Sequence, residues 1–365
     1  MNQSFLRDRE RAALNLSNRG PLSVDEKGKV DPSVVEAYWS HGFYVLTDVL
    51  SLVEMAELSE EFQNLLQRAP QEPGGTRDSS AKEVGFDERQ RKLFHFVKPL
   101  TDPYGGTDVT HSRYPVKMPE PELPLDSPDE VLLQIGGILQ FLDSALRVYG
   151  HPKLLALTEA INGHDFTPFT EVIWLKQPRF GAAVSWHQDG TTHWDSPNLD
   201  AGTHGFNFMV NIHETTTENS LWVVPGTHKN GKADLNAMLA DSDSDRPAGA
   251  VPLLCKPGDV AICNRQIVHG SFPNTSDVPR YTFVFGFHRR ASVEGIRGWG
   301  REPYSKEFIE RSCRLIDVAI DARRQRFPNE SSYCYRPSIE RTQLRWTTEE
   351  RRAELQNYQL RALGI

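Results

Sequence analysis

The chain has 365 residues, of which 41 are Lys or Arg and 49 are Asp or Glu, so its formal net charge is −8. This balance provides no general attraction for nucleic acid or an anionic membrane surface, and it disfavours a protein that binds through a basic patch. Hydrophobic residues make up 38% of the chain, enough for a sizeable core. The length fits one large domain or two smaller ones.

The N-terminal residues and the cysteines indicate the cellular compartment of the protein. Residues 1–16 are charged and lack the apolar stretch of a secretory signal. No apolar run approaches the ~18 to 20 residues that a membrane-spanning helix needs. Widely spaced cysteines without a Cys-x-x-Cys pair are typical of reduced structural thiols. We therefore expect a cytoplasmic protein with no membrane partner. The cysteines are Cys255, Cys263, Cys313 and Cys334.

The first elements follow from local signals. Residues 1–30 are polar, and we expect an irregular N-terminal extension. Asp31 followed by Pro32 is typical of a helix start, and Gly42 is typical of its end. Residues 43–49 are then predicted to form a strand.

A second helix is followed by a long insertion. Ser51 and Glu54 have the spacing of a capping box, which predicts a helix extending to about Arg68. Residues 71–126 are rich in Gly, Pro and charged residues. A segment of this length without periodicity is usually either disordered or functional. We interpret it as a candidate lid that determines specificity.

Residues 127–150 are predicted to form one helix, because Ser127, Pro128 and Glu130 combine three helix-start signals. Beyond Asp165 the pattern becomes alternating, and turns rich in Gly, Pro and Asn separate short apolar segments. The predicted strands are residues 170–177, 184–189, 206–213, 221–224, 251–256, 259–264 and 281–288.

Consecutive strands without regular intervening helices indicate a mainly β fold with flanking helices. The expected core is an antiparallel sandwich or a double-stranded jelly roll rather than a parallel α/β sheet. We expect this domain to span residues 31–290 and a helical C-terminal extension to span residues 291–365.

One cluster of residues indicates metal chemistry. His187 and Asp189 are two residues apart, so an extended strand places both side chains on one face. His269 follows a Pro-Gly-Asp turn and a further strand, a typical way for a jelly roll to return to the same end of the barrel. Together the three side chains would form a facial triad, which suits non-haem Fe(II) because three adjacent coordination positions stay open.

Arg280 lies eleven residues after His269, at the start of a predicted strand whose opposite face carries aromatic side chains. A buried arginine there requires an anion, and its planar guanidinium matches a carboxylate. The alternative is a salt bridge to an acidic residue on a neighbouring strand.

These residues resemble the phytanoyl-CoA dioxygenase-like family of Fe(II)/2-oxoglutarate-dependent oxygenases. The matching motifs are W-H-Q-D at residues 186–189, V-V-P-G-T-H-K at 223–229, P-G-D at 257–259 and H-G-S at 269–271, followed by Arg280. The segment at 41–50 also resembles the family's first strand. The resemblance covers roughly residues 31–290 and implies a double-stranded β-helix, a cupin-like jelly-roll core.

The resemblance implies that His187, Asp189 and His269 hold Fe(II) and are the catalytic metal ligands. It also implies that 2-oxoglutarate chelates the iron and that its far carboxylate pairs with Arg280 and the Ser271 hydroxyl. Reaction with O2 would then release succinate and CO2, and the usual outcome is hydroxylation of a small-molecule substrate. Halogenating relatives lack the carboxylate ligand, so Asp189 disfavours halogenation.

Further candidates line the expected cavity. Lys176 or Gln177 is expected to point into it, and alternation does not decide which. Asn207 and Asn211 lie on the polar face of the strand at 206–213 and are candidate cofactor or substrate contacts, with ordinary polar pairing as the alternative. Trp194 matches an aromatic residue found beside the cofactor in relatives, although core packing explains it equally well.

Other interpretations remain at this stage. His193 or His213 could replace His269 in a different metal site. A non-catalytic metal-binding jelly roll and a zinc hydrolase use similar ligands. The same oxidative chemistry also allows desaturation or ring rearrangement. The substrate and the oligomeric state stay open, with a homodimer as one alternative.

Overall fold

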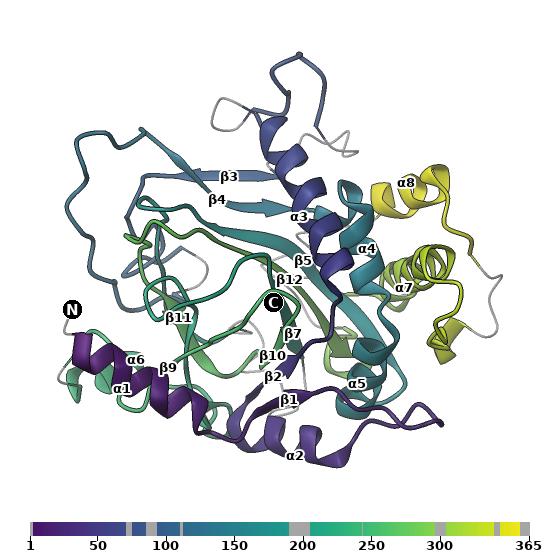
Figure 1. Cartoon of the computed structure of the whole chain (residues 1–365), viewed down its shortest axis with the longest axis horizontal. Helices are drawn as coiled ribbons and strands as arrows, with labels where there is room; N and C mark the ends of the chain where they lie inside the picture. The colour runs from purple at the N-terminus through teal and green to yellow at the C-terminus, as the bar shows by residue number, and fades with distance from the viewer. Residues whose placement is uncertain are drawn as a thin grey trace.

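The computed structural model describes residues 3–70, 75–84, 93–109, 112–189, 205–242, 244–295, 304–338 and 344–357. Within these ranges, two sheets face each other and helices cover the outer side of the larger one (Figure 1). The strands of the larger sheet, in spatial order, are β1 (Arg19–Pro21), β2 (Phe43–Thr47), β10 (Val260–Asn264), β7 (Phe206–Asn211), β12 (Arg280–Arg289), β5 (Phe166–Lys176), β4 (Val131–Gly136) and β3 (Phe94–Val97).

The smaller sheet contains two of the three predicted metal ligands, His187 and His269. Its order is β6 (Val184–His187), β11 (Val268–Ser271), β8 (Trp222–Val224) and β9 (Val251–Pro252). The strands of both sheets pair antiparallel, apart from the parallel pair β1–β2. The mainly β jelly roll with flanking helices that the sequence predicts is confirmed.

Alternation along β7 and β12 separates the two faces of the larger sheet. Phe208 on β7 and Phe285 on β12 point to the outer face and belong to the main hydrophobic core. Met209 and Val284 point inward, toward the smaller sheet. The outer core is completed by α3 (Leu52–Gln67), α4 (Asp143–Tyr149), α5 (Pro152–Asn162) and α7 (Lys306–Arg326), which Figure 1 shows beside the larger sheet.

Four further helices lie around the sheets. They are α1 (Gln3–Leu14), α2 (Pro32–His41), α6 (Leu235–Ala240) and α8 (Thr348–Asn357). Leu6 of α1 and Leu235 of α6 pack with Trp222 of the smaller sheet. Among the described residues, no helix is long and apolar enough to cross a bilayer.

The predicted helix ends form as expected. The side chain of Asp31 accepts a hydrogen bond from the Ser33 backbone N–H at the start of α2. Gly42 ends that helix with a φ of 82°, and a Cβ on it would lie 2.4 Å from Nδ1 of His228, so only glycine fits. The capping box of Ser51 and Glu54 is also present at the start of α3.

Two predicted segments differ from the structure. Residues 127–150 do not form one helix: β4 comes first, then a 3₁₀ turn at Ile138–Gln140, then α4. The apolar run of β4 is held between β3 and β5, so sheet pairing prevails over the helix-start signal, and Gly137 takes a φ of 68° where the chain turns. Residues 1–30 are not irregular either, because they contain α1 and β1.

The insertion at 71–126 is partly built into the fold. Its residues 94–97 form β3, which pairs with β4 at the edge of the larger sheet. The pattern was missed because four residues at a sheet edge carry too little periodicity. The strand β11 was also missed, although it contains two of the predicted site residues.

The C-terminal helix α7 is tied to α3 by a buried ion-pair network. Arg323, only 4% exposed, donates to Oε1 of Glu54 at 2.8 Å and to both carboxylate oxygens of Glu330. Its neighbour Arg326 pairs with Glu57 at the surface.

We therefore expect R323Q to lower the free energy of unfolding by about 3 to 5 kcal/mol, because a buried carboxylate loses its partner. R326Q is the control and should cost at most about 1 kcal/mol. Equal losses in urea unfolding would contradict this assignment.

Glu171 on β5 is fully buried and accepts a hydrogen bond from the Ile138 backbone N–H at 2.9 Å. Burial raises its pKa well above the usual 4.5, against the lowering effect of the backbone N–H groups of Ile138 and Gly137. The folded state thus binds this proton more tightly than the unfolded state, so stability is lost as the pH rises from the usual pKa through the raised one.

We expect E171Q to gain stability relative to the wild type over that interval, measured by urea unfolding at several pH values. A constant difference between the two proteins would contradict the raised pKa.

Candidate metal centre

Two histidines face each other across paired strands of the smaller sheet. His187 is the last residue of β6, and its register partner on β11 is His269. Opposite residues of an antiparallel pair project to the same face, and here the ring centroids are 4.0 Å apart. The sheet register therefore brings together two imidazoles that are 82 residues apart in the sequence.

Each imidazole is oriented by the backbone of its own strand. Nδ1 of His187 lies 2.8 Å from the carbonyl oxygen of Ser185, and Nδ1 of His269 lies 2.9 Å from that of Ile267. A carbonyl only accepts, so each Nδ1 carries the proton and each Nε2 has a free lone pair. This is the tautomer that metal-binding histidines adopt when a second-shell carbonyl holds the other nitrogen.

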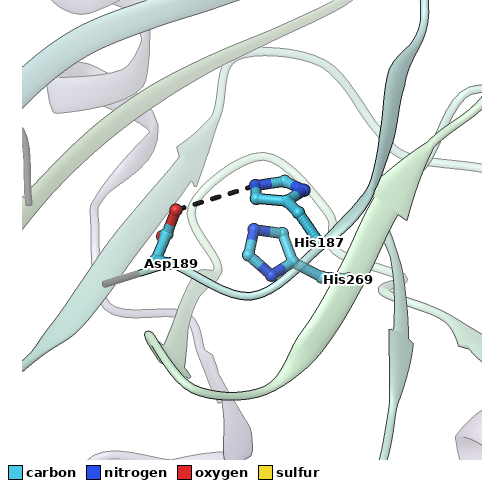
Figure 2. Close-up of side chains that lie close together, drawn as sticks. All are labelled: His187, Asp189 and His269. Carbon is cyan, nitrogen blue, oxygen red and sulfur yellow. Dashed lines mark ion pairs between the residues drawn. The ribbon is translucent and has the colours of Figure 1, made fainter. Parts of the chain in front are cut away.

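Asp189 supplies the third ligand position. Its backbone N–H donates to the Arg265 carbonyl oxygen at 2.8 Å, which fixes the chain just beyond β6. Its Oδ1 lies 3.6 Å from Nε2 of His187. One ligand atom from each of the three side chains lies within 4.8 Å of the others, and Figure 2 shows the carboxylate turned toward the imidazoles.

Electrostatics act on two of the three side chains. Burial by itself raises the pKa of Asp189, but nearby positive charge, led by Arg265, outweighs it, so the pKa lies below its usual range and the carboxylate is ionised. Burial lowers the pKa of His187 well below 6.5, so this imidazole is neutral. Imidazole nitrogens and an ionised carboxylate are ligands that suit a divalent transition metal.

The three side chains open into a cavity of about 120 Å³ between the two sheets. Its wall is cationic near Arg280 and apolar near Trp174, Leu221 and Val284. The remaining lining residues are Arg113, Tyr114, Leu133, Leu175, Lys176, Val184, Asn207, Met209, Ser271 and Thr282.

Arg280 and Ser271 both line this cavity, as the sequence predicts, although their roles there remain predictions. Arg280 is 5% exposed, and it donates to the Asn219 carbonyl and to the Thr282 hydroxyl. Two neutral acceptors hold the guanidinium in place without neutralising it. The alternative of a salt bridge to an acidic residue finds no support among the described residues.

The structure decides between Lys176 and Gln177. Lys176 lines the cavity and its ammonium group donates to the carbonyl oxygens of Ala182, Ser271 and Phe272, whereas the Gln177 amide lies against the backbone of Leu132. Lys176 therefore bridges β5 to the end of β11, while Gln177 does not reach the cavity.

The remaining candidates differ in their positions. Asn207 donates to Oδ2 of Asp189 at 3.3 Å, next to the metal ligands. Asn211 instead accepts from the Thr282 hydroxyl, which in turn accepts from Arg280. His213 packs against Tyr281 and is not part of the three-residue cluster. Trp194 and His193 lie outside the described residues.

Two arginines at the centre were missed by sequence reasoning. Arg113 comes from the insertion, and its Nη1 lies 3.4 Å from Oδ1 of Asp189. Arg265 is 1% exposed, and its Nε lies 3.8 Å from Oδ2 of the same carboxylate. Tyr114, beside Arg113, packs its ring 4.6 Å from that of His187. Arg265 lies four residues before His269, and this closeness to a predicted ligand could have marked it as a site residue. Arg113 lies in a segment without periodicity, where no local pattern indicates a role at the site.

The fold and this cluster define the class of protein: a jelly-roll protein with a mononuclear two-histidine, one-carboxylate metal site. The phytanoyl-CoA dioxygenase (PhyH) family model matches residues 38–282. The chain therefore belongs to the phytanoyl-CoA dioxygenase family.

Individual relatives match parts of the chain. Phytanoyl-CoA dioxygenase 1 of Oryza sativa subsp. japonica is 34% identical over 29% of this chain and 39% of its own length. Phytanoyl-CoA dioxygenase domain-containing protein 1 of Rattus norvegicus is 28% identical over 43% of this chain and 57% of its own length. The chain thus aligns with about half the length of these relatives. L-proline trans-4-hydroxylase of Streptomyces griseoviridis is 25% identical over 46% of this chain and 72% of its own length.

Among solved structures, EctD from S. alaskensis in its apoform has the same fold. It aligns with a TM-score of 0.51 at 19% identity and covers 78% of this chain and 86% of its own.

We expect the protein to bind one divalent transition metal at His187, Asp189 and His269. H187A and H269A should each weaken binding of Co²⁺ at least about 100-fold, because loss of a direct ligand costs more than loss of a second-shell partner. The visible absorption of bound Co²⁺ measures this. H213A is the matched control and should bind Co²⁺ like the wild type. If H213A abolished binding while H269A retained it, the assigned ligand set would be wrong.

Proposed function

We propose that this chain is a non-haem Fe(II)- and 2-oxoglutarate-dependent oxygenase that hydroxylates an unactivated C–H bond of a small-molecule metabolite. The observation that carries the proposal is the pairing of a two-histidine, one-carboxylate cluster with a buried, un-neutralised arginine in one cavity. Family membership supports the dioxygenase class.

His187, Asp189 and His269 would hold Fe(II). Asn207 and Arg265 approach Oδ2 of Asp189, whereas Oδ1 faces Nε2 of His187 and also lies 3.4 Å from Nη1 of Arg113. Three coordination positions then remain for the 2-oxo acid and O2. With these bound, the iron supplies oxidative decarboxylation of 2-oxoglutarate to succinate and CO2 and the oxidation of a substrate C–H bond.

Arg280 would bind the far carboxylate of 2-oxoglutarate, with Ser271 as a hydroxyl donor. The shared cavity supports this assignment, because Arg280 and Ser271 line the same space as the three metal ligands.

The hydroxylation outcome draws support from the similarity to L-proline trans-4-hydroxylase. The described cavity wall combines apolar side chains with charged and polar ones, which suits a small metabolite. We also propose a cytoplasmic location and no nucleic-acid or membrane partner, on the basis of charge and cysteine usage. The insertion at 71–126, which brings Arg113 and Tyr114 to the site, is proposed as the specificity element.

The function is tested by anaerobic titration with Fe(II) and 2-oxoglutarate, followed by addition of O2. We expect a visible charge-transfer band and then O2-dependent release of succinate. A non-catalytic metal-binding protein would give no succinate, and a zinc hydrolase would need neither 2-oxoglutarate nor O2. Mass analysis of products from a metabolite pool separates hydroxylation, a gain of one oxygen, from desaturation, a loss of two hydrogens. Absence of both band and succinate would refute the proposal.

We expect R280Q to weaken 2-oxoglutarate binding about 10- to 100-fold, because a charge-assisted hydrogen bond to a carboxylate is lost. The charge-transfer band, titrated anaerobically, gives the dissociation constant. Binding of Co²⁺ without 2-oxoglutarate should be unchanged and serves as the folding control. R290Q, at a partly buried arginine paired with Asp165 outside the cavity, is the matched control. Equal affinities in R280Q and the wild type would remove Arg280 from the co-substrate site.

A further inference from the structure

A row of aromatic rings leads away from the metal ligands. The ring of Tyr114 lies 4.6 Å from that of His187, and Tyr104 stacks on Tyr114 at 5.4 Å with an interplanar angle of 21°. His95 stacks on Tyr104 at 6.1 Å and 17°. His95 is half-buried on β3, so the row connects the metal centre with the edge of the larger sheet.

The two outer members of the row, Tyr104 and His95, share a hydrogen bond. The Tyr104 hydroxyl lies 2.9 Å from Nε2 of His95, a hydrogen bond in which the phenol donates when Nε2 carries the lone pair. Burial raises the pKa of Tyr104, so the phenol keeps its proton at neutral pH. The proton therefore leaves only if the ring is oxidised, and His95 is the base placed to receive it.

The buried phenol groups of the row have polar partners. The Tyr104 hydroxyl is hydrogen-bonded to His95, and the Tyr114 phenol interacts with Arg113. Such partners offset the cost of burying a hydroxyl. A phenol differs from a phenylalanine ring in that it can give up an electron and a proton together, which a row of phenylalanines would not allow.

We propose that Tyr114, Tyr104 and His95 form a redox relay that returns an electron to the metal centre when O2 is activated without substrate. This proposal rests on the proposed oxygenase function, since the oxidant would be the one that bound Fe(II) supplies from O2 and 2-oxoglutarate. The relay protects the side chains at the site from oxidation.

Electrons and protons are both accounted for. One electron would leave the ring of Tyr104 and pass through the ring of Tyr114 to the oxidant held by the metal ligands. The phenolic proton of Tyr104 would move to Nε2 of His95, which leaves a neutral tyrosyl radical beside an imidazolium. A small reductant such as ascorbate or a thiol would later return the electron to Tyr104, with the proton coming back from His95. A second electron from the same reductant and two protons from water would restore Fe(II) and release the remaining oxygen atom as water.

The test uses the full chain loaded with Fe(II) and 2-oxoglutarate but no substrate. The charge-transfer band is recorded first; O2 is then added, and samples are frozen within the reaction time for electron paramagnetic resonance. We expect an organic radical signal that narrows in protein containing ring-deuterated tyrosine. The signal should disappear in Y104F and fall strongly in Y114F and H95Q. Y44F, at a buried tyrosine on β2 away from the row, is the matched control and should keep the signal.

A second readout is damage to the protein. Peptide mass spectrometry should find more oxygen added to residues of the cavity in Y104F than in wild type or Y44F after equal succinate release. If the band forms and succinate is released but no radical appears, or the radical is equal in Y104F, the relay is refuted while the oxygenase function stands. If neither band nor succinate forms, both proposals are refuted. The deuterated wild type keeps the test valid if a variant fails to fold.

Discussion

The antiparallel pairing of β6 with β11 is the constraint on which the site depends. It places His187 opposite His269, and the carbonyl oxygens of Ser185 and Ile267, each two residues before a histidine, fix both rings with Nε2 turned inward. Because the orienting groups are backbone atoms of the same strands, the two imidazoles need no separate support. Any slip of this pairing by one residue would turn one histidine to the other face.

The Asp189 carboxylate is held in place mainly by charged side chains rather than by strand pairing. Asp189 follows the end of β6, outside regular pairing, and its position depends on the Arg265 carbonyl, the Asn207 amide and the guanidinium groups of Arg265 and Arg113. These contacts keep the carboxylate ionised in a buried setting. They come from β7, the segment before β11 and the insertion, so the third ligand links the smaller sheet to the rest of the molecule.

The insertion has more than one structural role. Its β3 extends the larger sheet, Arg113 contacts a metal ligand, and Tyr104 and Tyr114 form the row that ends at His187. This arrangement is consistent with the proposed specificity role and with the redox relay.

Alternation and capping are local, so the sequence predicted the mainly β fold and the ends of α2 and α3. That His187, Asp189 and His269 belong to one site followed from the order of the motifs and their resemblance to a family, whereas their actual meeting depends on the pairing of β6 with β11. Other features were decided by the tertiary structure alone. Residues 131–136 became a strand because β3 and β5 offered pairing partners, and Lys176 rather than Gln177 reached the cavity because three carbonyl groups there accept its protons. Arg113 joined Asp189 across 76 residues. Contacts between distant segments leave no local pattern, since they depend on where each strand comes to lie.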